Sequence, residues 1–157
     1  MKKPTPAILI GLGGATASLI EKYLHQGRLP NLATLIKKGA FTRMRPIFPG
    51  TPPVGWASVS TGAYPGMHGI TASVMPGKSG GLESGMDGYS PSAGQAQTLW
   101  QAVASRKLRV ATFNFPGSVP SQDENHVSMA GRGLPADQIE YALCQSSCFA
   151  TPTYQTQ

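Results

Sequence analysis

The sequence predicts an α/β fold with a largely parallel sheet flanked by helices. Residues 7–12 and 109–115 are short apolar runs that each end at glycine or proline, as strands buried inside a parallel sheet do. Between them lie segments with helical spacing of apolar residues, so strands alternate with helices along the chain. Ligands of such sheets gather where strands end, so we expect a functional site in the loops after Leu12, Phe48 and Phe115.

Two amphipathic helices are expected to follow the first strand and its Gly13-Gly14 turn. Ser18 and Glu21 form a capping-box pattern, and apolar residues at helical spacing continue to about residue 26. Pro30 breaks that helix. Asn31 is a typical N-cap for a second helix, which Gly39 is placed to end. Residues 41–48 alternate loosely and predict an edge strand.

The second half is expected to hold further helices and one more strand. Helices are predicted near residues 56–61, 97–106 and 137–144 and a strand over 109–115. In the middle helix Leu99, Trp100 and Val103 should face inward. Residues 72–96 are rich in Gly, Ser, Met and Pro without any period, so we predict a long loop there.

Composition and charge exclude several classes of protein. Charged residues make up 13% of the 157, well below the roughly 25% of ordinary domains, and the net charge is +6. Residues 1–45 hold eight bases and one acid, without the aromatic residues that accompany bases in nucleic-acid sites, so we expect a solvated helical face and no nucleic-acid partner. No apolar run approaches the roughly 18 residues needed to cross a bilayer, so no membrane association is expected.

The chain ends suggest a cytoplasmic location and unremarkable cysteines. After the N-terminal lysines only six apolar-compatible positions precede Gly13, too few for a secretory signal, so we expect a cytoplasmic protein. Cys144 and Cys148 are four residues apart and are read as ordinary thiols, since two alone make no zinc site. The glycine-rich turn over residues 11–16 lacks both the dinucleotide and the P-loop spacing, so a nucleotide-binding fold is weakly supported.

Four blocks of sequence carry a resemblance to a known family. They are residues 8–16, residues 27–32 with Gly39, the stretch from Thr51-Pro-Pro through Thr61-Gly62 to Pro65-x-x-His68-Gly-Ile70, and residues 98–116. In this order the chain resembles the N-terminal part of type I phosphodiesterase/nucleotide pyrophosphatase proteins, of the alkaline phosphatase superfamily, over about residues 7–120. The resemblance implies an alkaline-phosphatase-like fold, with residues 1–157 as the N-terminal portion of one catalytic domain.

The resemblance also implies a chemistry. Two divalent metals, usually zinc, would activate a threonine or serine hydroxyl that attacks the phosphorus of a small phosphate ester. Thr51 directly precedes the Pro-Pro pair and is implied as the nucleophile and as a metal ligand, although this sequence has one more residue before Thr61-Gly62 than the family pattern. The simpler interpretation of Thr51 is a turn residue before proline. His68 matches a family histidine that lies in a structural turn, so packing and hydrogen bonding are expected of it.

Departures from the family pattern lower the expected activity. Gly13 stands where family members place a metal-binding aspartate, in Gly-Leu-Asp-Gly, and glycine offers no carboxylate. The later Asp-x-x-x-His and Asp-His motifs have no counterpart before Gln157. We therefore expect a truncated hydrolase domain with an incomplete sheet, inactive alone. The alternatives are a non-catalytic remnant that holds an anion with the Thr51 loop, and an unrelated small doubly wound protein.

The remaining polar residues receive structural interpretations. Ser58 and Ser60 are expected to be helix-surface or capping hydroxyls, and His25 to lie on a helix surface. Residues 123–126, Asp-Glu-Asn-His, have the wrong spacing for the family's metal motif, so we expect a solvated acidic turn.

Overall fold

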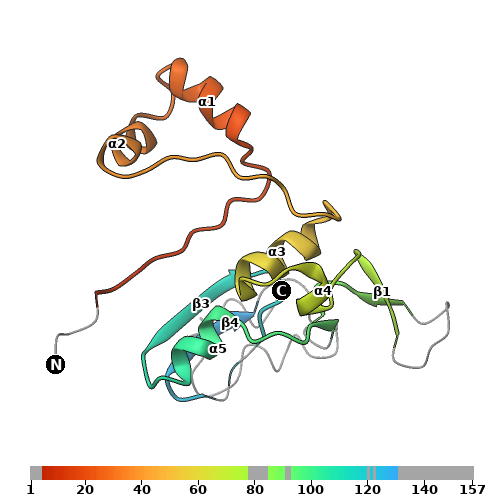
Figure 1. The fold of residues 1–157 in the computed structure, drawn as a ribbon. Helices are drawn as coiled ribbons and strands as arrows, with labels where there is room; N and C mark the ends of the chain where they lie inside the picture. Colours follow the sequence, from red (N-terminus) through yellow and green to blue (C-terminus); the bar gives the residue numbers. More distant parts are fainter. Residues whose placement is uncertain (1–4, 78–84, 91–92, 120, 122, 131–157) are drawn as a thin grey trace, which may run out of the picture. The chain divides into compact units, whose positions relative to one another are not determined.

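The computed structural model describes residues 5–77, 85–90, 93–119, 121 and 123–130 (Figure 1). The chain divides into two compact units, Met1–Arg45 and Pro46–Gln157. The predicted helix over residues 137–144 and the two cysteines lie outside the described residues.

The first unit is a pair of short helices. Helix α1, Ala17–His25, packs against helix α2, Pro30–Lys38, which ends at Gly39 as predicted. The predicted N-caps, Ser18 and Asn31, are wrong, because both lie inside the helices. Thr16 and Leu29 occupy the N-cap positions of α1 and α2, and neither side chain makes a capping hydrogen bond. Proline suits the first helical position because its missing N–H would have no partner there.

No capping box forms in α1, because the helix begins at Ala17 and Ser18 lies inside it. The guanidinium of Arg43 binds both carboxylate oxygens of Glu21, with Nε donating to Oε1 at 2.7 Å. This hydrogen bond lowers the pKa of Glu21. The side chain that the pattern assigned to capping is therefore engaged with a residue 22 positions later.

The predicted strand over residues 7–12 is not formed. Its residues are irregular, and the side chains of Ile8 and Ile10 are 87% and 73% exposed. Residues 41–48 form no strand either. An apolar run becomes a strand only when a neighbouring strand completes its hydrogen bonds, and the described part of the first unit contains none. The expected tight turn at Gly13-Gly14 is present, with Gly14 at φ +75°.

In its described residues the second unit combines three helices with two small sheets. The helices are α3 (Pro52–Thr61), α4 (Pro65–His68) and α5 (Leu99–Ala104), and the strands are β1 (Val74–Pro76), β2 (Gly85–Asp87), β3 (Val110–Phe115) and β4 (His126–Ala130). Strands β1 and β2 pair antiparallel, whereas β3 and β4 pair parallel. The α/β composition agrees with prediction, but among the described residues one largely parallel sheet is not observed.

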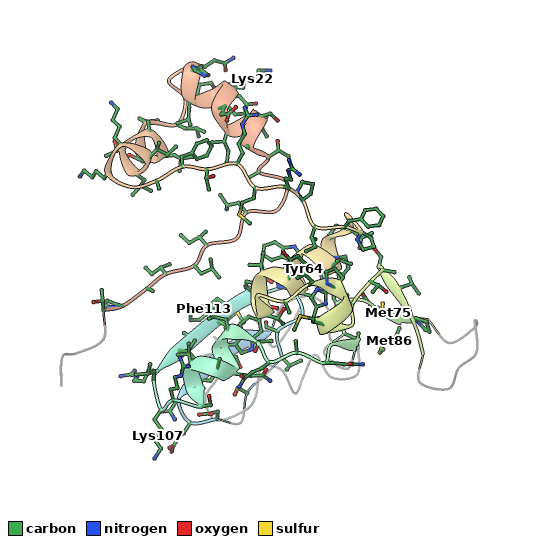
Figure 2. All side chains as sticks on the ribbon, viewed as in Figure 1. Lys22, Tyr64, Met75, Met86, Lys107 and Phe113 are labelled. Atoms are coloured by element: carbon green, nitrogen blue, oxygen red, sulfur yellow. The ribbon has the colours of Figure 1, made fainter. Side chains whose placement is uncertain are left out.

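The β1–β2 pair lies inside the segment that was predicted to be a long loop. Met75 and Met86 are register partners, and both pack against a core of Val54, Ile70 and Ala93 (the two methionines are labelled in Figure 2). Each strand has only three residues, too few for a visible period of two. The pair is therefore set by packing on the core, which the local sequence does not reveal.

Helix α5 is shorter than predicted but begins with a true capping box. Thr98 Oγ1 accepts the N–H of Gln101, whose Oε1 accepts the N–H of Thr98 at 2.8 Å. Trp100 is buried as expected, but Leu99 is 50% exposed, which corrects that prediction. Helix α5 has only six residues, so its buried face is narrow. That face includes Trp100 but not the neighbouring Leu99.

Replacing Gly55 by alanine is expected to stabilise the second unit by about 0.5–1 kcal/mol, because glycine is costly inside a helix. Gly55 lies within α3, and a Cβ built there would have nothing within 4 Å. Urea unfolding followed by circular dichroism measures the change. Gly62→Ala is the matched control: the space is equally empty, but φ is +66°, so alanine there should destabilise. A change of the same sign in both variants would contradict the explanation.

Candidate functional site

Thr51 stands at the N-cap of helix α3, with an extended backbone at φ −90° and ψ 147°. Its Oγ1 is buried and has no hydrogen-bond partner, the one such side-chain atom in the described part of the chain. Leaving a buried hydroxyl unpaired costs about 1–3 kcal/mol. A feature of that cost needs an explanation, and a ligand that binds the oxygen is one.

The Pro-Pro pair removes one of the two donors that could bind the Thr51 hydroxyl. An N-cap threonine normally accepts the N–H of the second or third helical residue. The second residue here is Pro53, which has no N–H, and the side chain makes no capping bond to Val54, the third. Pro52 and Pro53 suit the first turn of the helix, where their missing N–H groups would have no helical partner. The helix predicted near residues 56–61 therefore begins earlier, at Pro52, and Thr51 is its N-cap and not the predicted turn residue. The chemical role of Thr51 stays a prediction.

His68 joins the end of α4 to the middle of α3. Its ring is 1% exposed, Nδ1 accepts the backbone N–H of Ile70 at 3.1 Å, and Nε2 lies 2.9 Å from Ser58 Oγ. The expectation of packing and hydrogen bonding is confirmed. Burial lowers the pKa of His68. Because Nδ1 is an acceptor, we assign the neutral ring with its proton on Nε2, donating to Ser58.

This tautomer prevents the Ser58–His68 pair from acting as a nucleophile and base. A general base must accept the serine proton at the nitrogen that faces it, but that nitrogen already carries a proton. The surface interpretation of Ser58 is wrong, because its hydroxyl is half-buried against His68. Ser60 is also buried and donates to the Ala57 carbonyl at 3.0 Å. The sequence contained no spacing signal for the Ser58 contact.

A cavity of about 420 Å³ opens beside α3 and His68. Its described lining contains no Asp, Glu, Lys or Arg, and Thr51 does not contribute to it. Several of its polar groups are bonded internally: Ser60 and Thr61 both donate to Ala57, and Thr98 is engaged with Gln101. An uncharged wall does not favour a phosphate group, so we place the candidate site at Thr51.

The acidic turn is confirmed, but His126 is not part of it. Asp123 and Glu124 are exposed, and Asp123 Oδ1 accepts the N–H of Asn125 at 2.8 Å. His126 instead opens β4, is 2% exposed, and lies 2.9 Å from Thr112 Oγ1 on β3. Burial lowers its pKa, while Asp123 acts in the opposite direction. The correction follows from pairing with β3, a contact 14 residues away.

The described residues do not fit a two-metal centre. Thr51 offers one hydroxyl oxygen, and Gly13 offers no side-chain donor. No group of three or more His, Cys, Asp or Glu that could hold a metal occurs among the residues that the structure describes. The metals implied by the resemblance therefore stay a prediction.

None of the helices that the structure describes has the length and apolar character needed to cross a bilayer. The expected cytoplasmic location stays a prediction.

Comparison with known proteins matches most of the chain. The sequence model described as type I phosphodiesterase / nucleotide pyrophosphatase matches residues 7–153. Ectonucleotide pyrophosphatase/phosphodiesterase family member 1 of Homo sapiens is 32% identical over 120 residues, which are 72% of this chain and 12% of that protein. Venom phosphodiesterase 2 of Crotalus adamanteus is 27% identical over 118 residues, 73% of this chain and 14% of that protein. No solved structure matches.

Proposed function

Because the chain belongs to the type I phosphodiesterase / nucleotide pyrophosphatase family, we propose that it carries the nucleophile segment of a metal-dependent phosphate-ester hydrolase, with Thr51 as the nucleophile. The matched stretch spans only 12–14% of the length of the curated relatives, so the activity and the substrate are part of the proposal. The substrate class would be a small phosphodiester, as in the names of those relatives.

The uncommitted Thr51 hydroxyl is the observation that supports this proposal. A nucleophilic oxygen must be free to bind a metal or a phosphorus atom, and Pro53 removes one donor that would otherwise engage it. In attack the Oγ1–P bond forms and the bond from phosphorus to one ester oxygen breaks. The hydroxyl proton of Thr51 passes to water, the departing oxygen takes a proton from water and leaves as an alcohol, and the phosphoryl group with its other ester stays on Thr51. Since Oγ1 is covered in this structure, rotation about χ1 or a small shift of the N-cap must precede attack.

The anion-holding alternative has less support. A helix N-terminus binds anions through its free backbone N–H groups. Pro52 and Pro53 remove two of these donors from α3. The start of α3 is therefore a poor binding site for an anion. This favours the proposal that Thr51 is a nucleophile over the alternative that its loop only holds an anion.

Gly13 is the second part of the proposal. A side chain at that position supplies a carboxylate in the family pattern, and this chain has none. We therefore propose that residues 1–157 do not turn over phosphodiesters by themselves.

With zinc and an aryl phosphodiester such as bis(4-nitrophenyl) phosphate, the pure chain should release nitrophenol no faster than Thr51→Ala does. Gly13→Asp is expected to raise zinc retention severalfold in equilibrium dialysis, because carboxylate oxygens are strong ligands for divalent metals. Any phosphoryl adduct that forms in a single-turnover incubation should lie on the peptide that contains Thr51, which peptide mass spectrometry identifies.

Two comparisons make this test specific. Gly11→Asp adds the same charge two residues away and should change neither zinc retention nor labelling. Gly13→Asp combined with Thr51→Ala should keep the zinc and lose the adduct. Steady turnover by the unaltered chain would contradict the proposed inactivity, and an adduct on Ser58 would contradict the nucleophile.

A further inference from the structure

The hydrogen bond that the Ile70 amide donates to the His68 ring requires one protonation state of that histidine. We propose that His68 is an acid-sensitive latch, whose protonation breaks this hydrogen bond and loosens the turn of residues 68–70. This inference rests on the hydrogen bonds of the second unit and does not depend on the proposed function.

The geometry around the ring has no room for a second ring proton. The Ile70 N–H points at Nδ1 from 3.1 Å, so a proton added there would set two donors against each other. The other nitrogen, Nε2, already faces Ser58 Oγ at 2.9 Å. With the ring 1% exposed, water cannot solvate the resulting charge either. Protonation therefore requires the Ile70 contact to break.

The surroundings offer no carboxylate to stabilise a charged ring. Helix α3 contains no charged or titratable side chain, and neither do the other residues of α4. In the cavity beside the ring, Tyr89 is the one other titratable side chain among the described lining residues. Asp87, next along that segment, is exposed and accepts the N–H of Tyr89 at 3.0 Å. Tyr64, at the N-cap of α4, is 73% exposed.

The direction of the pH dependence follows from the burial. The closed state holds His68 neutral, with its pKa lowered by burial, whereas an opened state has a pKa near the ordinary value of 6.5. Below about pH 6.5 the opened state gains a proton that the closed state excludes, so opening becomes up to about tenfold more favourable per pH unit. Above that pH both states are neutral, and the balance does not depend on this group.

Opening would disturb more than one turn. Ile70 is 8% exposed and belongs to the core with Val54 and Ala93. Val54 is on the first turn of α3, directly after the Pro-Pro pair. Acid would therefore loosen the packing beneath the start of this helix.

Hydrogen exchange of the Ile70 amide between pH 7.5 and 5.0 tests the latch directly. Rates are expressed as protection factors, which remove the intrinsic pH dependence of exchange. The unaltered chain should lose protection at Ile70 below about pH 6.5, by up to about tenfold per pH unit. His68→Asn keeps an acceptor near the Nδ1 position and does not titrate, so its Ile70 protection should stay level. A level profile in the unaltered chain would overturn the proposal.

Three further measurements separate His68 from other causes. His126→Asn removes the other buried histidine and should leave the pH dependence of Ile70 protection unchanged. If the pH dependence is lost in this variant, the effect belongs to His126 and the latch is overturned. His25→Asn, on exposed helix α1, should change nothing. The ¹⁵N shifts of the His68 ring in the unaltered chain need no variant to fold: they should show the proton on Nε2 at pH 7.5, and a proton on Nδ1 would overturn the assignment.

Discussion

Replacing Trp100 by alanine is expected to lower the free energy of unfolding of the second unit by about 3–5 kcal/mol. Trp100 is 7% exposed and meets the ring of Phe115 edge-on, with centroids 5.1 Å apart. Phe115 in turn meets Trp56 at 5.2 Å. These three rings join α5, β3 and α3, so truncation leaves a cavity where three elements meet.

The loss should be measured by urea unfolding followed by far-ultraviolet circular dichroism. A total stability of about 5–15 kcal/mol is typical of small domains, so this variant should be partly unfolded near room temperature if the unit lies at the lower end. Leu99→Ala is the matched control, since Leu99 precedes Trp100 on the same helix but is 50% exposed. Its effect should be within about 0.5 kcal/mol. Equal losses in both variants would show that helix α5 does not anchor the unit.

The sequence predicted the elements that are fixed by local chemistry. Helix α2 ends at Gly39, helix α5 lies within the predicted range 97–106, and β3 ends at Pro116-Gly117, as the patterns indicated. Each of these signals acts within a few residues of the element that it starts or ends. They needed no knowledge of the rest of the fold.

The errors occurred where a distant partner decides the outcome. Residues 7–12 have the composition of a strand but no neighbouring strand in the described part of their unit. Glu21 had the position of a capping residue but binds Arg43. His126 had the surroundings of a turn but pairs with Thr112 on β3. Local sequence does not contain these contacts.

The candidate site shows the same division. The Thr-Pro-Pro pattern singled out Thr51, but the helix after it was predicted only from about residue 56, whereas α3 begins at Pro52. Proline is favoured in the first turn of a helix, and this local signal was not used. The burial of its oxygen without a partner is a tertiary property and became visible only in the structure. The role of Ser58 was missed because ten residues and a turn separate it from His68.

Gly88→Ala is expected to destabilise the second unit by about 1–3 kcal/mol through overpacking. A Cβ at this buried position would overlap the carbonyl oxygen of Ala72 and lie 3.1 Å from Pro53 Cβ. The residue cannot move aside freely, because its N–H donates to the Ser73 carbonyl at 2.8 Å. Pro53 belongs to the first turn of α3, so the strain falls on the helix start that positions Thr51.

Thermal and urea unfolding of Gly88→Ala measure this strain, and Gly66→Ala provides the comparison. Gly66 lies on α4, is exposed, and has nothing within 4 Å of a built Cβ, so alanine there should be neutral or slightly stabilising. Both variants add one methyl group and lower the entropy of the unfolded chain alike. Any difference between them therefore reports the native contacts of Gly88. If the two midpoints coincide, the backbone around Gly88 relaxes around a methyl group, and the close approach to Ala72 and Pro53 does not constrain the N-terminus of α3.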